Sequence, residues 1–175
     1  MNGSRELVDK IRNIIPEVRF DESWGLDHGA WSILKHIYPN ADIPVVQLSI
    51  DIHKAPNEHY NIAKKLQTLR NNGFLIIGSG NIVHNLPMIT RGNIQYNWAA
   101  EFNDAIKNAI ITNNFDAIIN YNQLPGAKES VPTQEHFIPL IYILGLCTDV
   151  DMVSIFVDGI ELGSISMTSV FIKGE

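Results

Sequence analysis

The chain has 175 residues, 45% of them hydrophobic and 18% charged, and a net charge of −6 at neutral pH. This composition is typical of a globular protein in water, and the length fits one domain over residues 1–175. The acidic balance without a basic patch argues against nucleic acid as a partner. The apolar runs are too short to cross a membrane, no secretory leader is recognisable, and a single cysteine excludes an internal disulfide. We therefore expect a cytoplasmic protein that does not bind membranes.

Apolar side chains recur at helical spacing in five segments. These segments cover residues 5–15, 29–38, 56–72, 98–113 and 134–145. Ser4 can cap the first helix, and Pro16 ends it. Pro56 suits the first turn of the third helix, and Gly73 suits its C-terminal end. Pro139 lies within the last segment, where it can occupy the first turn or bend the helix.

Two apolar segments between these helices predict buried strands. Residues 43–51 (IPVVQLSID) are rich in branched side chains, and residues 74–80 (FLIIGSG) are apolar almost throughout, as expected where both faces are covered. Two further strands near the C-terminus, joined around Gly159 and Gly163, predict a hairpin. Strands that alternate with helices indicate an α/β fold. We expect a central, mostly parallel sheet flanked by helices, with an antiparallel strand pair at the C-terminal end.

Three of the six histidines stand in loops next to predicted strand or helix ends. His84 follows the FLIIGSG segment, His28 lies in WGLDHGAW, and His136 follows the sequence VPTQE. In α/β folds, chemistry takes place at the carboxyl edge of the sheet. Neutral imidazole is a general base and the commonest metal ligand, and two histidines with one carboxylate are a usual ligand set for non-haem Fe(II). The carboxylates available near these histidines are Asp27, Asp51 and Glu135.

Each of these histidines also has a structural interpretation. Asp27 can simply cap a helix, with His28 packed under Trp31. His84 can bond a backbone carbonyl, and a lone histidine such as His136 is more often structural. Zinc-protease, paired-cysteine, nucleophile-elbow and Walker motifs do not occur in the sequence, and GSGNIV lacks the third glycine of a dinucleotide fingerprint. The residue patterns alone therefore lead to an α/β domain with a plausible histidine site.

Longer stretches carry a family resemblance. They are GLDHGAWSILKHIYPNADIPVVQLSID, GFLIIGSGNIVHNL, NWAAEFNDAI, VPTQEHFIPLIYILG and GSISMTS. In this order, and over nearly the whole chain, they resemble the class III extradiol ring-cleaving dioxygenases. The similarity is greatest to the DOPA 4,5-dioxygenase type, which is related to the catalytic subunit of protocatechuate 4,5-dioxygenase. The resemblance implies a non-haem Fe(II) site, sometimes occupied by zinc, at which a catechol ring is opened with O2 to give a semialdehyde.

The resemblance also assigns roles to individual residues. His84 is expected to act as acid and base on the catechol hydroxyl and bound oxygen, or to bind the metal. His136 is expected to be a metal ligand with Glu135 beside it. His28 should line the substrate pocket and be oriented by Asp27. The residues expected to contact substrate are His28, Ser79, Asn85 and Thr133.

Departures from the family pattern lie mainly at the N-terminus. Members normally begin with a segment that carries an S-H-G and an A-H-W type motif, whose histidines are the principal metal ligands, and residues 1–27 match neither motif. Val131 and Thr168 stand where relatives usually have histidine and arginine. The resemblance thus places residues 1–175 as the central and C-terminal part of the dioxygenase domain, a partial version of its fold. We expect weak or absent metal binding and an open apolar face, remedied by homo-oligomerisation or by a separate N-terminal segment.

The sequence is compatible with three functions of different classes. The first is an extradiol dioxygenase, or a piece of one. The second is a catalytically silent domain that persists as an oligomeric or partner-binding protein. The third is a zinc-dependent hydrolase built on His84, His136 and Glu135, which would need a third strong ligand that the sequence does not identify.

Overall fold

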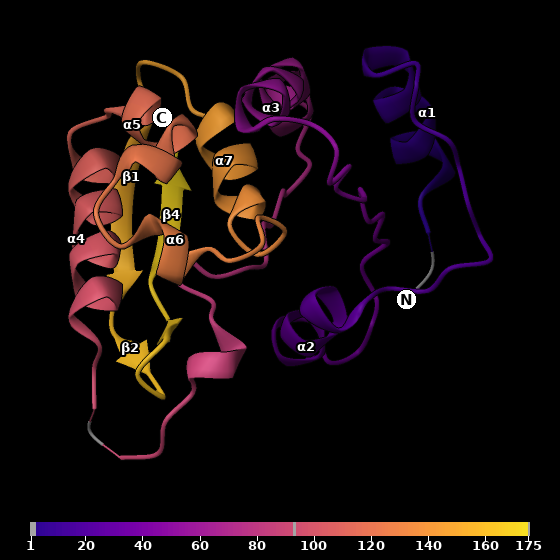
Figure 1. Cartoon of the computed structure of the whole chain (residues 1–175). Helices are drawn as coiled ribbons and strands as arrows, with labels where there is room; N and C mark the ends of the chain where they lie inside the picture. Colours follow the sequence, from indigo (N-terminus) through magenta and orange to yellow (C-terminus); the bar gives the residue numbers. More distant parts are fainter. Residues whose placement is uncertain (1–2, 93, 175) are drawn as a thin grey trace.

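The computed structural model describes residues 3–92 and 94–174. Its helices are α1 (Arg5–Ile14), α2 (His28–Ile37), α3 (Pro56–Asn71), η1 (Leu86–Met88), α4 (Asn97–Ile111), α5 (Phe115–Ile119), η2 (Tyr121–Gln123), α6 (Ala127–Ser130) and α7 (Ile138–Gly145). Its strands are β1 (Met152–Val157), β2 (Ile160–Glu161), β3 (Ile165–Ser166) and β4 (Ser169–Lys173). Figure 1 shows α1 and α2 on one side of the molecule, while the strands and α4 to α6 form the other side, with α3 and α7 between them.

The five predicted helices are confirmed, and their end signals act as expected. The Ser4 side chain caps α1 by accepting a hydrogen bond of 3.2 Å from the backbone N–H of Leu7. Pro56 occupies the first turn of α3, and Gly73 follows that helix with a φ of 80°. Pro139 lies in the first turn of α7, which therefore begins later than predicted. Within the part of the chain described, no helix combines the length and apolar character needed to cross a bilayer.

The antiparallel pair at the C-terminus is also confirmed. Strand β1 runs antiparallel to β4, from the pair Met152 and Lys173 to the pair Val157 and Ser169, with an irregularity after Ile155. The short strands β2 and β3 form a second antiparallel pair between them. One face of β1 packs on α4, so this strand pair closes one side of the main core.

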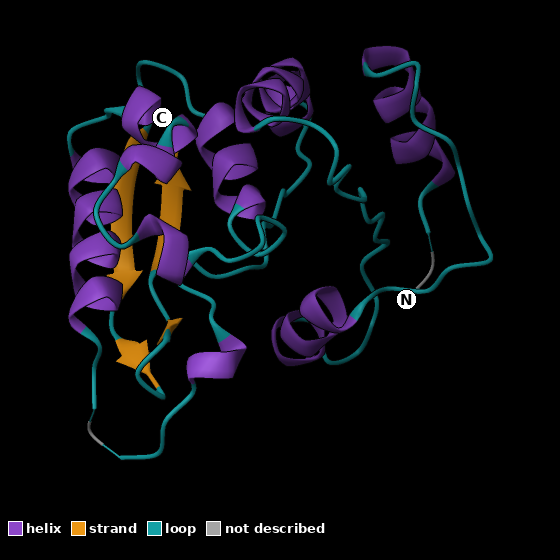
Figure 2. Ribbon diagram, viewed as in Figure 1, coloured by secondary structure: helices purple, strands orange, loops and turns teal. Residues whose placement is uncertain are grey.

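The predicted central parallel sheet does not form within residues 3–92 and 94–174. Segments 43–51 and 74–80 are not assigned as strands, and Figure 2 draws strands only in the C-terminal region. Residues 43–50 and 75–80 make no backbone–backbone hydrogen bond with any described residue. A strand exists only as part of a ladder, because its N–H and C=O groups need a neighbouring chain. The side chains of both segments have the apolar character predicted for strands. The described residues, however, provide no neighbouring chain with which these segments pair.

Two apolar clusters hold the chain together. The larger is built from α4, α5, α7 and residues 82–83, with Phe102 and Phe137 at its centre. The smaller joins α1 and α3 to Leu146, and the apolar side chains of segments 43–51 and 74–80 pack against its edge. Arg70 on α3 ties the smaller cluster to the residue before β1, since its guanidinium bonds both Asp151 carboxylate oxygens at 2.8 Å and the Leu146 carbonyl at 2.7 Å.

Candidate functional site

Two of the predicted site histidines lie in direct contact. The rings of His84 and His136 stack with centroids 3.5 Å apart and an angle of 14° between their planes. The segments that carry them are joined by the Asn81 N–H, which donates to the His136 carbonyl at 2.8 Å. Gly80 makes this approach possible, because a Cβ atom there would collide with that same carbonyl oxygen. The small residues of the GSG turn therefore have a definite role, which is to let the His84 loop pass against the start of α7.

Backbone contacts fix the His84 loop on its other side. The His84 N–H donates to the Ser130 carbonyl at 2.9 Å, and His84 forms an isolated antiparallel bridge with Ile165. Next to it, the side-chain amide nitrogen Nδ2 of Asn85 donates to the Glu129 carbonyl at 2.7 Å. Sequence reasoning did not identify Ser130 or Ile165, because both contact His84 through backbone groups and both are distant from it in sequence. The Asn85 amide nitrogen serves this loop, while its predicted contact with substrate stays a prediction.

The surroundings favour uncharged imidazoles. Burial lowers the pKa of His84, and the neighbouring His136 lowers it further. Burial likewise lowers the pKa of His136, with Glu135 acting in the opposite direction. An ordinary histidine titrates near a pKa of about 6.5, so both rings are neutral at pH 7. A neutral ring can accept a proton or bind a metal ion, which a protonated ring cannot do.

Glu135 is the carboxylate that accompanies this pair. Burial acts to raise its pKa, but the Thr133 hydrogen bond and the two histidines outweigh burial, so its pKa lies below the usual value. The Thr133 hydroxyl donates to Oε1 of Glu135 at 2.7 Å. Thr133 was predicted to contact substrate; in the structure it holds the ionised carboxylate beside the histidines.

The remaining predicted residues lie at the start of α2. His28 is close enough to lower the pKa of both His84 and His136 electrostatically. Asp27 caps α2 by accepting from the Ala30 N–H at 2.8 Å, and its other oxygen accepts from the Gln47 side chain at 2.6 Å. Asp27 therefore caps α2 as one of its two interpretations requires, and its predicted orientation of His28 stays a prediction.

Ser79 completes this group from the GSG turn. A Cβ atom built on Gly29 would lie 3.5 Å from the Ser79 hydroxyl and 3.4 Å from an Asp27 carboxylate oxygen. The start of α2 therefore meets the GSG turn. The structure brings the predicted residues from α2, the GSG turn, the His84 loop and the segment before α7 to one region of the molecule.

These residues do not by themselves make a metal centre. Imidazole and carboxylate are donor types that Fe(II) and Zn(II) accept, and both metals need at least three protein ligands in a stable site. Among residues 3–92 and 94–174, no group of three or more histidine, cysteine, aspartate or glutamate side chains is placed to hold a metal ion. His84 and His136 face each other through their rings. The described donor set thus does not fit Fe(II) or Zn(II) without further ligands.

A polar cleft lies between the start of α3 and the α5–η2 segment. It has a volume of about 780 Å³, and its lining includes Gln134, two residues before His136 in the sequence. Its walls carry several side-chain amides and the rings of Tyr60 and Tyr121. Burial raises the pKa of Tyr121, and the Glu135 charge raises it further, which places the cleft close to that carboxylate. Clefts of this size accommodate small organic molecules.

Comparison with known proteins defines the class. Residues 1–166 match the family described as the catalytic LigB subunit of aromatic ring-opening dioxygenase. The chain therefore belongs to this family, that of the class III extradiol dioxygenases, as its sequence motifs indicated.

Particular relatives show how much of such a protein is present. The chain is 41% identical to "4,5-DOPA dioxygenase extradiol" of Escherichia coli K12, with 96% of this chain matched to 65% of that protein. It is 36% identical to the protein of the same name from Beta vulgaris, over 82% of this chain and 56% of the relative. A crystal structure of an uncharacterized protein from Escherichia coli K12 superposes with a TM-score of 0.88 at 40% identity, over 96% of this chain and 72% of that one. The chain thus spans less than two thirds of the length of these curated relatives.

Proposed function

We propose that this chain supplies the acid–base and substrate-binding side of an extradiol dioxygenase that opens a catechol ring with O2. The observation that carries the proposal is the stacked, neutral pair of His84 and His136 beside Glu135, in a chain that belongs to the ring-opening dioxygenase family. Relatives named 4,5-DOPA dioxygenase support a catecholic substrate. A semialdehyde is the product that cleavage beside the two hydroxyls would give.

His84 is the proposed acid–base group. Burial and the neighbouring His136 keep its ring neutral at pH 7, so it can accept the proton of a catechol hydroxyl. Once His84 is protonated, its burial disfavours the new charge, which favours passing the proton on. With ring centroids 3.5 Å apart, no aromatic ring fits between the histidines, so substrate must approach their edges.

The other predicted residues have proposed places around that position. His28 and Ser79 would contact substrate from the α2 side, and Asn85 and Thr133 from the loops that hold His84 and Glu135. Asp27 would act on His28 only by fixing the start of α2, because its oxygens bond Ala30 and Gln47. The amide-lined cleft beyond Gln134 would accommodate substituents of the substrate away from the reacting ring.

Metal binding by His136, His84 and Glu135 stays a proposal that requires ligands from outside the described residues. We expect this chain alone, loaded anaerobically with Fe(II) and desalted, to retain far less than one iron per molecule. Stoichiometric iron that is lost in His136→Ala would contradict this expectation and would show that the described residues suffice. The cytoplasmic location and homo-oligomer predicted from the sequence likewise remain predictions.

Oxygen consumption with a panel of catechols tests the proposed reaction. The wild-type chain, together with any completing polypeptide and Fe(II), should consume O2 and form a coloured semialdehyde. His84→Ala should reduce the rate about a hundredfold, in line with the loss of a positioned acid–base group. His36→Ala, at an exposed position on α2, is the matched control and should retain the full rate.

One result would favour the silent partner-binding domain instead. If no catechol supports oxygen uptake under conditions in which the intact Escherichia coli relative is active, the dioxygenase proposal fails for this chain. Segments 43–51 and 74–80, whose backbones are almost unpaired within the described residues, are the observation that supports this second function. A zinc hydrolase gains no such support, since the described residues supply no third strong ligand.

A further inference from the structure

The cleft between the start of α3 and the α5–η2 segment has a distinctive lining. Among the described residues of its wall, Asp116 is the one acidic side chain, and none is a lysine or an arginine. Recognition of a phosphate or a carboxylate normally uses such a cation. The wall instead carries five side-chain amides, those of Asn57, Asn61, Asn120, Asn122 and Gln134.

One wall of the cleft is a single face of α3. Asn57, Tyr60 and Asn61 are three and four positions apart, so their side chains lie on the same side of the helix. The start of this helix is fixed, because the Glu58 carboxylate accepts a hydrogen bond of 2.8 Å from the Ala55 N–H. The amides of this wall therefore have set positions.

The opposite wall is held by the larger apolar cluster. The ring of Tyr121 packs on Phe137 with centroids 4.3 Å apart and meets the edge of Phe102 at 6.4 Å. Next to it, the side-chain amide of Asn120 donates to the Asp116 carbonyl at 2.8 Å. A cleft with two fixed walls binds a small molecule without first ordering them.

The amides of the cleft have hydrogen-bonding groups to offer. Gln134 uses its Nε2 to hold the Ile52 carbonyl at 2.9 Å, which leaves its oxygen as an acceptor. Within residues 3–92 and 94–174, the side chains of Asn57, Asn61 and Asn122 make no hydrogen bond to protein. A carboxamide presents a donor and an acceptor side by side, and a hydroxyl group is likewise both donor and acceptor. Several amides around one space thus complement a molecule that carries several hydroxyls.

Two tyrosines add apolar surface and further donors. Burial raises the pKa of both Tyr60 and Tyr121, so their hydroxyls stay protonated at pH 7 and can donate hydrogen bonds. Part of each ring also lines the cleft. Aromatic rings of this kind present an apolar body next to a polar tip. A sugar ring has the matching character, because its hydroxyls project from an apolar carbon frame.

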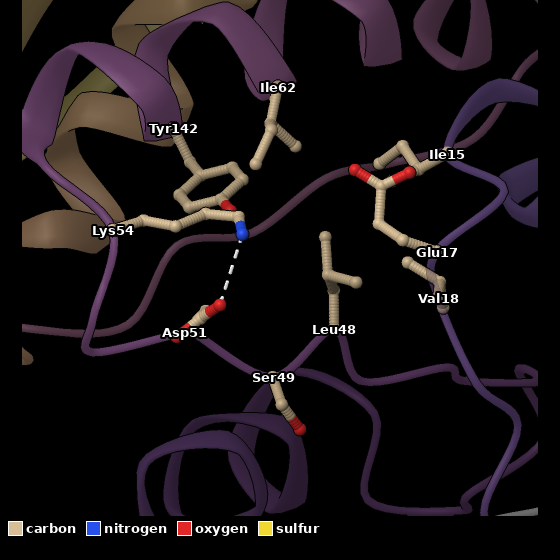
Figure 3. A pocket seen from close by; sticks show the side chains of 9 residues that line it. All are labelled: Ile15, Glu17, Val18, Leu48, Ser49, Asp51, Lys54, Ile62 and Tyr142. Atoms are coloured by element: carbon tan, nitrogen blue, oxygen red, sulfur yellow. Dashed lines mark hydrogen bonds and ion pairs between the residues drawn. The ribbon is translucent and has the colours of Figure 1, made fainter.

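A smaller cavity on the other side of α3 provides a contrast. It has a volume of about 160 Å³ and lies between residues 48–51, residues 15–18, α3 and α7 (Figure 3). Leu48 and Ile62 project into it, and an ion pair of 3.1 Å between Lys54 and Asp51 borders it. Its lining contains no side-chain amide among the described residues. A polyhydroxylated molecule therefore matches the larger cleft and not this cavity.

We propose that the amide-lined cleft binds a neutral, polyhydroxylated ring of hexose size, either a free sugar or the sugar of a glycosylated aromatic compound. An anion would meet Asp116 without a compensating cation, and an apolar ligand would leave the amides without partners. This inference goes beyond the proposed function, because the lining of the cleft carries it without metal, oxygen or the histidine pair.

NMR of the side-chain amide groups tests the proposal on the full chain. The probes are methyl glucoside, glucose 6-phosphate as the charged analogue, and cyclohexanol as a ring with a single hydroxyl. Methyl glucoside should shift the NH2 signals of Asn57, Asn61 and Asn122 in a saturable way. Glucose 6-phosphate should bind more weakly because Asp116 repels it, and cyclohexanol should cause no saturable shift.

A matched pair of substitutions locates the binding site. Asn61→Leu removes one amide from the cleft and should weaken methyl glucoside binding about fivefold, as expected for one lost hydrogen bond. Asn108→Leu makes the same change at an exposed position of α4, outside the cleft, and should bind normally. Both positions are exposed, and unchanged backbone amide signals in each variant verify that the fold is retained.

A glucoside of catechol distinguishes the two sources of the sugar. If it shifts the signals of His84 and His136 together with those of the cleft, the sugar belongs to a substrate; if it shifts the cleft alone, the ligand is a separate sugar. Sugar binding by a chain that consumes no oxygen with any catechol would leave this inference standing and reject the proposed function.

Four results would overturn the proposal. They are the absence of a saturable shift with methyl glucoside, equal shifts with cyclohexanol, tighter binding of glucose 6-phosphate, and equal weakening by the two substitutions. Shifts confined to residues around the smaller cavity, such as Leu48 and Ile62, would likewise reject the cleft as the site. Oxygen uptake with catechols in the presence of any of these results would leave the proposed function intact.

Discussion

The C-terminal and N-terminal parts of the chain both contain apolar, β-forming segments, but only those of the C-terminal part pair into strands. In the C-terminal part, the apolar segments 152–157 and 169–173 pair as antiparallel strands next to α4. In the N-terminal part, the equally apolar segments 43–51 and 74–80 remain extended and unpaired within the described chain. Short loops can join antiparallel strands, whereas parallel strands need neighbours brought from distant parts of the sequence. The difference shows that a segment's tendency to form a strand depends on its own residues, whereas a sheet also depends on a neighbouring segment that can pair with it.

The largest expected effect comes from comparing a substitution in the buried core with one in the exposed segment 74–80. Phe102 on α4 is fully buried in the larger cluster, whereas Leu75 is 69% exposed. Phe102→Ala should lower the free energy of unfolding by about 3–5 kcal/mol, through lost burial and the cavity that remains. Leu75→Ala should change it by less than about 0.5 kcal/mol. Urea unfolding of both variants measures these values; similar losses would mean that segment 74–80 is packed on both faces after all.

The next test concerns the link between the two sides. Arg70→Ala removes the partner of Asp151, whose side chain is only 3% exposed, and should cost about 3 kcal/mol in unfolding free energy. Arg5→Ala, which breaks an exposed pair with Asp9 on α1, is the control and should have no measurable effect. Equal stability of both variants would mean that the Arg70–Asp151 pair adds nothing measurable to the stability of the fold.

The pH dependence of the unfolding free energy provides an independent check of the Arg70–Asp151 ion pair. Hydrogen bonds from Arg70 hold the pKa of the Asp151 carboxyl well below its ordinary value. A carboxyl with a depressed folded-state pKa stabilises the fold above its unfolded pKa of about 3.9, and this contribution is lost as pH falls further. The stability difference between wild type and Arg70→Ala should therefore persist from pH 7 to about pH 4 and shrink below it.

The smallest effect is expected at the boundary between the two sides, in the GSG turn. A Cβ at position 80 would collide with the His136 carbonyl, so Gly80→Ala should cost about 2 kcal/mol through overpacking and separate the stacked rings. Gly25→Ala, where a Cβ would meet no atom within 4 Å, is the control. Histidine NMR titration should show the pKa values of His84 and His136 moving toward the ordinary value in the first variant only. Unchanged titration in Gly80→Ala would mean that the turn does not set the ring contact.

Helices and site residues were predictable from sequence to different extents. End signals such as Ser4, Pro56 and Gly73 act within a few residues, so the helix positions followed from local chemistry. The short helices α5 and α6 carry too few turns to give an apolar period. The central sheet could not be judged from one sequence, because its ladder depends on residues that the segments themselves do not contain.

In the candidate site, too, some residues could be predicted from local sequence and others could not. His84, His136 and Glu135 were predicted from their motifs, and the structure places them close together, while their roles in the site stay predictions. The anchors of the His84 loop, Ser130 and Ile165, were missed because they act through backbone groups that any residue carries. Asp27 caps α2, which is one of its two predicted roles, while its orientation of His28 stays a prediction.

The open edge of residues 74–80 also has a consequence for how this chain behaves at high concentration. An exposed, apolar, extended segment without proline is the kind of sequence that seeds growing stacks of strands between molecules. The net charge of −6 opposes such contacts by mutual repulsion, and salt weakens that opposition. We therefore expect the isolated chain to aggregate with rising ionic strength, at a rate that Leu75→Asp slows.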